Sequence, residues 1–522
     1  MLAKFGMIKT KLVVLMLLPF ILLSGCIPKE NIIRMDLQVP VINLDPQFTT
    51  ESAAQMLIMN LFEGLVVQTP QGDIIPGCAE SWEISDDDLR YTFNLRENLY
   101  WSDDDKTPIT ADDFVFGISR LFAAPVSPHA AEFIAIKGAK QRIAGSSYPL
   151  GVEAPNEHTL VITLEQPDPT LLAKLAGTAA MPCNRKFFES CRGRYGLDQN
   201  LILSNGPFAL QDWNNEKHIL IQKNKSYHSP DEVVADMVYF YTNREDSLVQ
   251  FENNKSQVIL LPQAKLDKLK RSDISFNPAG NTIWCLVINT KDSFWRLPIL
   301  RQALAFATNR EPLAAEGIAV TELILPEGIL IGESDFFQLV DTASPVGYAP
   351  KEAQRLFALG LSALELDLPP ALTILTPDSA EQMQYMGALQ QIWQRELSLY
   401  PRIQRLPGDA LYRRVAEGDF QAALLPFETT SEQVADMLEL FAKANNAEYK
   451  NTIYNSFVAD AQNAVNINYM AQRYAQAQRL LLADAPIIPL YEEITYYVTA
   501  NSVKNLWVYP FSGNLYFKYA EN

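Results

Sequence analysis

Alternating hydrophobic and polar positions predict short β-strands along the chain. The clearest run has Leu89, Tyr91, Phe93 and Leu95 on one face and polar residues between them. A period of two is typical of a strand with one buried face. This strand is predicted to pair with residues 82–85 across the three aspartates that separate them. The same pattern predicts strands at residues 159–164, 208–213, 218–222, 237–241, 283–289, 403–406 and 422–425.

Apolar residues spaced three or four positions apart predict helices between these strands, as at Met383, Met386 and Leu389. Helices are predicted at residues 111–122, 297–307, 352–359, 383–397, 432–441 and 471–483. Because strands and helices interleave throughout, we expect a mixed α/β protein. Linkers rich in proline and glycine are missing, so we expect interwoven domains with more than one chain crossing between them.

The length and charge of the chain limit the number of domains and the classes of ligand that we expect. At roughly 150 residues per domain, 522 residues indicate about three domains. The formal net charge of −18 makes nucleic acid an unfavourable partner. The chain has only four scattered histidines, which disfavours a histidine-built metal site. We therefore expect a protein with neutral or cationic ligands, no metal and no nucleic acid.

The N-terminal residues predict an export signal with lipid attachment. Basic residues precede an apolar run at 12–23, which is too short to span a bilayer of about 30 Å. The run ends in Leu-Ser-Gly followed by Cys26, which resembles a bacterial lipobox. We expect residues 1–25 to be a lipoprotein signal peptide and Cys26 to carry a diacylglyceryl anchor. The alternative is an ordinary signal peptide that happens to contain a cysteine.

The other four cysteines are Cys78, Cys183, Cys191 and Cys285, which allow three pairings. The residues between Cys183 and Cys191 have a helical pattern, and eight residues of helix separate two positions by about 12 Å. That distance is too long for a disulfide. We expect free, mostly buried thiols.

Catalytic signatures are missing from the sequence. We find no G-x-S-x-G, H-E-x-x-H, Walker A, G-x-G-x-x-G or EF-hand pattern. A glycosidase-type carboxylate pair stays open, because such residues meet in space rather than in sequence. We expect no enzyme activity and no cofactor.

A series of short motifs occurs in a fixed order along the chain. They are Leu44-Asp45-Pro46, Leu61-Phe62-Glu63-Gly64-Leu65, residues 76–82, Tyr91 to Arg96, residues 101–103 and 110–115, Leu150-Gly151-Val152, residues 159–160, Asn205-Gly206-Pro207, Arg301 to Leu304, Asn309-Arg310 and Ile487-Ile488-Pro489-Leu490. From about residue 33 to 520 the chain thereby resembles the oligopeptide- and dipeptide-binding lipoproteins, which are extracytoplasmic solute-binding proteins of ABC importers. The motif aromatics are expected in the core, and Arg96 and Arg301 are expected to form structural ion pairs.

The resemblance implies an α/β clamp of the periplasmic-binding-protein type, in its type II, three-domain variant, with hinge strands between two lobes that close on the ligand. Domain I would combine residues 33–62, 176–280 and 490–522; domain II would be 63–175 and domain III 281–489. The implied partners are a peptide or other small solute, a membrane permease and a separate ATPase. We expect a monomer outside the cytoplasm that meets the membrane only through its lipid.

Peptide-binding relatives hold the ligand as an extended strand between two protein segments. Here the resemblance places the first segment after Leu44-Asp45-Pro46 and the second in domain III, with a side chain from domain II between them. The implied ligand-binding residues are Phe48, Thr49, Thr50, Glu51, His129, Leu425, Pro426, Phe427, Glu428 and Thr430.

The second segment departs from the family pattern. Thr430 stands where an Asp pairs with the peptide amino terminus, and Thr lacks the charge for a hydrogen bond worth roughly 1.5–3 kcal/mol. Phe427 replaces a Trp, Gly408 replaces an aromatic residue, and Pro426 has no N–H to donate. Either Glu428 supplies the missing charge, or the ligand has no free amine.

Three functions therefore remain open. The first is a peptide-binding importer lipoprotein. The second is the same clamp binding a modified peptide, an oligosaccharide or a metal chelate. The third is a non-transport role in sensing or chaperone-like binding.

Overall fold

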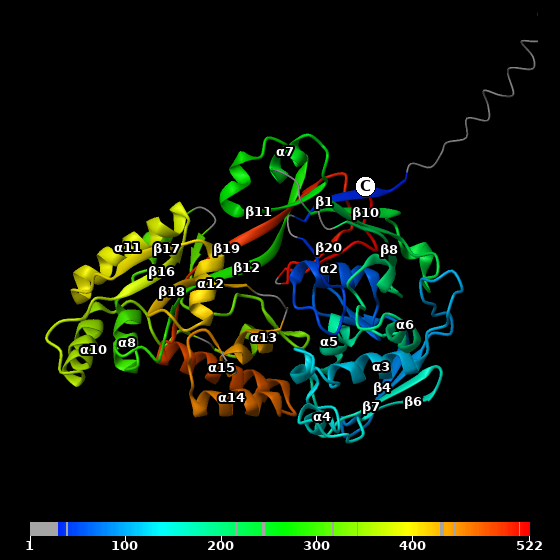
Figure 1. The fold of residues 1–522 in the computed structure, drawn as a ribbon, viewed down its shortest axis with the longest axis horizontal. Coiled ribbons are helices and arrows are strands. Elements are labelled where there is room, and N and C mark those ends of the chain that lie inside the picture. Colours follow the sequence, from blue (N-terminus) through cyan, green and yellow to red (C-terminus); the bar gives the residue numbers. More distant parts are fainter. Residues whose placement is uncertain are drawn as a thin grey trace, which may run out of the picture.

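The computed structural model describes residues 30–37, 40–214, 217–242, 246–315, 318–341, 343–428, 433–442, 445–510 and 512–522. Two lobes lie side by side, and long strands run between them (Figure 1). Cys26 and Thr430, both singled out by the sequence, lie outside the described residues.

One mixed sheet of eleven strands extends through both lobes. Its strand order is β17-β16-β18-β12-β19-β11-β1-β10-β9-β8, and β13 pairs with β19 away from this path. The strands are β1 (Ile32–Asp36), β8 (Phe208–Asn214), β9 (His218–Lys223), β10 (Met237–Tyr241), β11 (Val258–Pro262), β12 (Ile274–Ile288), β13 (Ile318–Val320), β16 (Thr373–Pro377), β17 (Arg402–Leu406), β18 (Ala422–Glu428) and β19 (Ile487–Ala500).

The antiparallel strands β12 and β19 connect the lobes. Ile274 of β12 pairs with Ala500, and both pack in a small core beside β11. Farther along, Leu286 pairs with Ile488 in the core of the other lobe. The ladder changes register between Pro278 and Asn281 and again between Trp284 and Cys285. These irregularities interrupt the pairing between the two cores, as expected of a hinge.

A separate antiparallel sheet stands at the far side of the first lobe, in the order β4-β5-β7-β6. Trp82 of β4 lies opposite Phe93 of β5, which confirms the predicted hairpin. The strands are β4 (Ala79–Ile84), β5 (Arg90–Leu95), β6 (Val152–Asn156) and β7 (Thr159–Thr163). Two-stranded ladders join β2 (Val66–Gln68) to β3 (Ile74–Pro76), β14 (Leu330–Ile331) to β15 (Ser334–Asp335), and β20 (Trp507–Val508) to β21 (Leu515–Tyr516).

The predicted helices form within a few residues of their predicted bounds. The one predicted at 432–441 is a short α13 followed by a 3-10 turn at Glu439–Ala442. The α-helices are α2 (Ser52–Leu61), α3 (Ala111–Leu121), α4 (Ala139–Ile143), α5 (Leu171–Ala176), α6 (Arg185–Ser190), α7 (Ser247–Glu252), α8 (Pro298–Ala307), α9 (Phe336–Leu339), α10 (Pro350–Ala363), α11 (Ala380–Leu397), α12 (Gly408–Ala416), α13 (Val434–Leu438), α14 (Thr452–Gln462) and α15 (Ile467–Asp484).

Two groups of buried side chains correspond to the two lobes. The first is one continuous cluster with Phe93, Trp101 and Phe114, and it takes residues from the ranges expected for domains I and II. The second group consists of two clusters on opposite faces of β12 and β18, one around Trp393 and one around Tyr454. The first lobe is therefore packed around one core that unites the four-stranded sheet with part of the large sheet.

The thiols of Cys78, Cys183, Cys191 and Cys285 are buried and free, as predicted. Arg96 and Arg301 both have structural partners inside the protein. Arg96 donates to the carbonyl oxygen of Gly77 at 2.8 Å, and Arg301 donates to the carbonyl oxygens of Trp295 and Asp484. Charge interactions with acidic side chains accompany these bonds, from Glu232 on Arg96 and from Asp484 on Arg301. Among the described helices, we find none that is long and apolar enough to cross a membrane.

Candidate functional site

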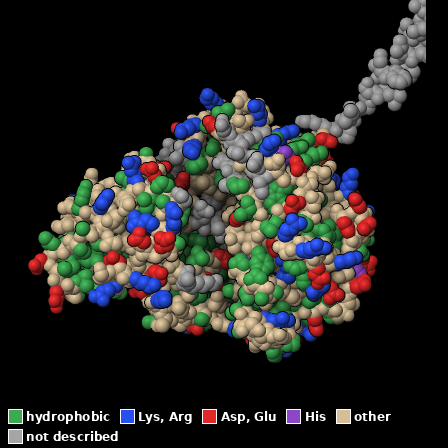
Figure 2. Space-filling model, viewed as in Figure 1, with side chains coloured by type: hydrophobic (Ala, Val, Ile, Leu, Met, Phe, Trp, Pro, Cys, Tyr) green, Lys and Arg blue, Asp and Glu red, His purple; other side chains and the backbone are tan. Residues whose placement is uncertain are grey.

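A cavity of about 260 Å³ lies where the two lobes meet. The space-filling view shows the molecule hollowed between the lobes (Figure 2). The first lobe contributes α2 with Thr50 before it, and also β2, α5 and the turn that holds His129. The second lobe contributes α13 with Gln433 before it. The lining residues are Thr50, Gln55, Met59, Val67, Gln68, His129, Glu132, Ala173, Ala176, Gly177, Thr178, Ala179, Gln433, Asp436, Tyr509, Ser512 and Asn514.

His129 is held on both sides of its ring. Its Nε2 lies 2.9 Å from the carbonyl oxygen of Thr49, and its Nδ1 lies 2.7 Å from a carboxylate oxygen of Glu132. Both partners are acceptors, so the doubly protonated imidazolium satisfies both contacts. Burial alone would lower the pKa of His129, but the hydrogen bond and charge of Glu132, the Thr49 carbonyl and the charge of Asp436 outweigh burial and raise it.

The segment before α2 is fixed by a buried polar network. Arg120 of α3 pairs with Asp45 at 2.5 Å and donates to the side-chain oxygen of Gln47. The amide of Gln47 in turn donates to the carbonyl oxygens of Ala179 and Met181. The Leu44-Asp45-Pro46 motif therefore holds the chain in place just before it reaches the cavity.

The four residues predicted after this motif differ in placement. The ring of Phe48 lies 5.7 Å from the Arg120 guanidinium, so it belongs to the network. Thr49 is buried behind the cavity, where its carbonyl meets His129. Thr50 lines the cavity, and exposed Glu51 immediately precedes α2.

In the second lobe, Leu425 and Phe427 of β18 pack in the core, away from the predicted ligand contact. Leu425 is 2% exposed, and the ring of Phe427 lies 5.7 Å from that of Phe441. Pro426 pairs with Trp284 of β12, and Glu428 pairs through its backbone with Thr282. The cavity wall of this lobe comes instead from Gln433 and Asp436, a little farther along the chain.

Gln433 belongs to a contact that joins the lobes. Its side-chain oxygen accepts a hydrogen bond from the N–H of Gly332 at 2.8 Å, and its side-chain nitrogen donates to the carbonyl oxygen of Gly332 at 3.1 Å. Gln68 of β2, in the other lobe, donates to the same carbonyl at 3.4 Å. Gly332 has a φ of +62°, a left-handed conformation that side-chain-bearing residues rarely adopt. The backbone of Gly332 is thus one point where the lobes touch beside the cavity.

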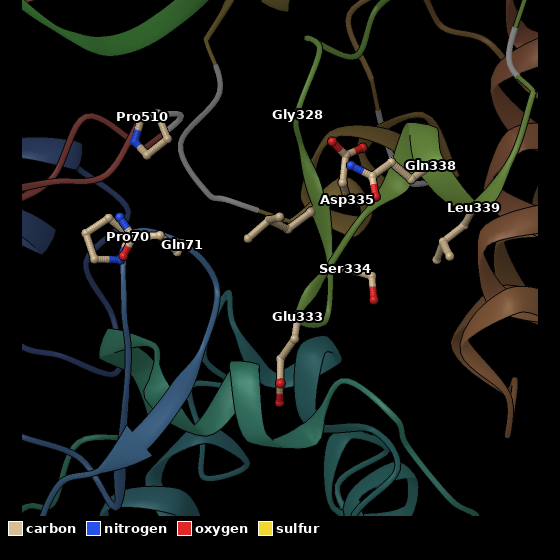
Figure 3. Close-up of a pocket in the computed structure, with 10 residues that line it drawn as sticks. Pro70, Gln71, Gly328, Glu333, Ser334, Asp335, Gln338, Leu339 and Pro510 are labelled. Carbon is tan, nitrogen blue, oxygen red and sulfur yellow. The ribbon is translucent and has the colours of Figure 1, made fainter.

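A second cavity of about 590 Å³ lies beside the first one, again between the two lobes (Figure 3). Pro70 and Gln71, from the turn between β2 and β3, face the β14–β15 hairpin across it, and Pro510 lies above them. Glu333 and Asp335 come from that hairpin. Because Pro70 and Pro510 follow closely on Gln68 and Tyr509 of the first cavity, the two cavities are neighbours.

Sequence reasoning missed Gln433, Asp436 and Asn514 as wall residues. Asp436 lies inside a helix that the sequence does predict, but spacing alone does not reveal which helix faces the other lobe. Asn514 follows β20 in a short polar stretch without a recognisable motif. Among the described residues, no group of three or more His, Cys, Asp or Glu side chains is placed to hold a metal ion.

Two lobes joined by crossing strands, with a cavity between them, are the architecture of a solute-binding clamp. The chain belongs to the bacterial extracellular solute-binding proteins of family 5, because the model for the middle region of that family matches residues 73–449. The predicted periplasmic-binding-protein-like α/β fold is confirmed. Members of this family are binding components of transport systems, not enzymes.

Named relatives cover nearly the whole chain. The probable deoxycholate-binding periplasmic protein YgiS of Escherichia coli is 25% identical in an alignment 508 positions long that covers 91% of each chain. The periplasmic oligopeptide-binding protein OppA of Salmonella typhimurium is 26% identical and covers 92% of this chain and 90% of its own. The structure of Listeria monocytogenes OppA bound to peptide superposes with a TM-score of 0.77 at 22% identity, over 94% of this chain and 99% of that one.

Proposed function

We propose that this protein captures peptides between its lobes and delivers them to the permease of an ABC importer. The observation that carries the proposal is the cavity, whose walls come from both lobes and whose edge is bridged by Gln68 and Gln433 at Gly332. A ligand held there would contact both lobes at once, so its binding favours the closed arrangement of a clamp. Similarity to an oligopeptide-binding protein over nine-tenths of the chain supports a peptide as the ligand.

The proposed binding mode uses main-chain hydrogen bonds to an extended peptide. Residues 48–51 and 425–430 are the proposed flanking segments, with His129 between them. Thr50 and His129 line the cavity, while the side chains of Leu425 and Phe427 support the second segment from the core. The contribution of these two would be to position the backbone, because their side chains pack inside their own lobe.

A lipid anchor on Cys26 is the second part of the proposal. It rests on the basic residues, the short apolar run and the Leu-Ser-Gly-Cys26 sequence. The anchor would keep the clamp at the outer face of the membrane, near a permease. The test is labelling of cells with radioactive palmitate: wild type is expected to incorporate label and Cys26→Ser to incorporate none. Equal labelling of both proteins would refute the anchor.

A non-peptide solute is the competing function, and two points favour it. A relative of similar identity is described as a probable deoxycholate-binding protein. The resemblance also implies that Thr430 stands where peptide-binding relatives carry an Asp. Native mass spectrometry of the protein purified from its own cells separates the two functions. Peptide masses released on unfolding support peptide capture; a single bile-salt-like or sugar mass would replace it with the competing function.

A further inference from the structure

The first lobe holds the start of its first strand at a fixed point. The backbone N–H of Asn31 donates to a carboxylate oxygen of Asp236 at 2.7 Å. Its side-chain nitrogen donates to the carbonyl oxygens of Val234 and Ala520, at 2.9 and 3.2 Å. Its side-chain oxygen accepts from the N–H of Asn522 at 2.8 Å. These bonds fix Asn31 immediately before β1, an internal strand of the large sheet.

The C-terminal residues lie around the same point. The side chain of Asn522 donates to the carbonyl oxygen of Ile32 at 2.8 Å, and Glu521 exchanges two backbone hydrogen bonds with Lys504. Figure 1 accordingly shows the C-terminus beside β1. Three side chains close to Asn31 are exposed, and we call them the entry face of the first lobe: Val234, Lys504 and Glu521.

The proposed lipid anchor is very close to this fixed point in the sequence. Asn31 follows Cys26 by only five positions. An extended chain spans at most about 3.3–3.6 Å per residue, so the two residues are at most about 18 Å apart. The acyl chains on Cys26 would insert into the bilayer, which places the backbone of Cys26 at the level of the lipid headgroups. A folded chain of this length is on the order of 60 Å across, so the tether is much shorter than the molecule.

We propose that this short tether holds the entry face against the headgroup layer of the membrane. The inference rests on the lipid anchor of the proposed function and deepens it, because it states which side of the protein faces the lipid. Lys504 and Glu521 balance each other in charge, so the tether, rather than attraction to charged lipids, sets the orientation. The second lobe is joined to the first by β12 and β19, so anchoring the first lobe leaves the second free to open and close.

The test is fluorescence quenching of the lipidated protein in phosphatidylcholine vesicles that carry nitroxide-labelled headgroups. A fluorophore is attached to one introduced cysteine, since the described native thiols are buried. We expect severalfold stronger quenching in Lys504→Cys than in Glu157→Cys or Lys351→Cys. Glu157 lies in the turn between β6 and β7, and Lys351 lies in α10; both are exposed and far from β1 (Figure 1). High salt should leave the difference unchanged, because screening does not act on a covalent tether.

A longer linker tests whether the tether is the cause. Inserting about twenty Gly and Ser residues between Lys29 and Glu30 adds a flexible segment with a root-mean-square length of roughly 25 Å. Quenching of the fluorophore at Lys504→Cys should then fall toward the value for Glu157→Cys. The control is the same insertion between Asp367 and Leu368, in an exposed loop of the second lobe, which should leave the quenching at Lys504→Cys unchanged.

The outcomes distinguish this inference from the proposed function. If protein that incorporates palmitate is quenched equally at all three positions, the anchor stands and the fixed orientation is refuted. If quenching at Lys504→Cys stays strong with the long linker, the tether does not hold the entry face at the membrane and the inference fails. If wild type incorporates no palmitate, the proposed anchor fails and this inference fails with it.

Discussion

The Nε2 atom of His129 and the carbonyl oxygen of Thr49 lie 2.9 Å apart, although 80 residues separate them in sequence. This hydrogen bond ties the segment before α2 to the turn ahead of the 3-10 helix Ala130–Phe133. Glu132 holds the other side of the ring. One charged imidazole thus fixes two elements of the cavity wall relative to each other.

The first prediction is that His129 makes stability depend on pH. The folded state raises the pKa of His129 above its ordinary value of about 6.5. Its stabilising contribution is therefore complete below that value and is lost as the pH rises through the folded pKa. His129→Gln should lower the melting temperature more at pH about 5.5 than at pH about 8.5, because only the imidazolium is bonded on both sides.

Measuring melting temperature across this range for wild type, His129→Gln and His158→Gln checks the prediction. His158 is exposed, so its replacement should leave the pH profile unchanged. Parallel profiles for wild type and His129→Gln would show that the imidazole charge does not contribute to folding.

The second prediction concerns the buried pair of Arg120 and Asp45. Arg120→Met keeps most of the side-chain volume but leaves the Asp45 carboxylate buried without a cation. The expected loss is about 3–5 kcal/mol in the free energy of unfolding, measured by urea denaturation. Arg90→Met is the control, because Arg90 and Glu153 form an exposed pair at 3.8 Å that should contribute less than about 1 kcal/mol. Similar losses in both variants would contradict the network's importance.

The third prediction explains the Asn205-Gly206-Pro207 motif. A Cβ at Gly206 would lie 2.7 Å from the backbone nitrogen and carbonyl carbon of Phe62, at the end of α2. Backbone cannot rotate away as a side chain can, so Gly206→Ala should cost about 1–3 kcal/mol. Gly387, inside α11, has open space at its Cβ, and Gly387→Ala should stabilise by about 0.5–1 kcal/mol. The same sign for both variants in thermal melting would refute this explanation.

The fourth prediction is closure on a ligand. With a peptide that calorimetry shows to bind, at a hundred times its dissociation constant, the free energy of unfolding should rise by about 2.7 kcal/mol. Small-angle scattering should show a smaller radius of gyration, because β12 and β19 allow the lobes to approach. Saturation by calorimetry without a change in radius or melting temperature would mean that the lobes do not move.

Local patterns predicted much of the fold. The β4–β5 hairpin follows from alternation alone, because Trp82 and Phe93 are core residues in paired strands. The start of β12 is different: residues 274–281 include Pro278 and Gly280, which break a strand pattern. They are extended because β19 pairs with them across the lobes, and that pairing is invisible in local spacing.

The site was predicted less completely, since it depends on which elements face each other. The resemblance implied that His129 and Thr50 are ligand-binding residues, and both line the cavity. Asp436 and Asn514 come from elements far from them in sequence, and only the tertiary structure places them there. Phe427 shows the opposite case, because its alignment suggested a ligand contact while its ring packs against Phe441. Its role in ligand binding stays a prediction.

The position of β19 has a consequence for synthesis of the protein. β19 pairs with β11 in the first lobe and with β12 in both, and Phe517 packs in the first core. Neither lobe can complete its sheet or core until residues 487–522 have been made. A nascent chain without these residues therefore lacks the strand that joins its two halves, and stable folding must wait until they have been made. For a protein that crosses a membrane during export, this delay keeps the chain in the unfolded form that a translocation channel can thread.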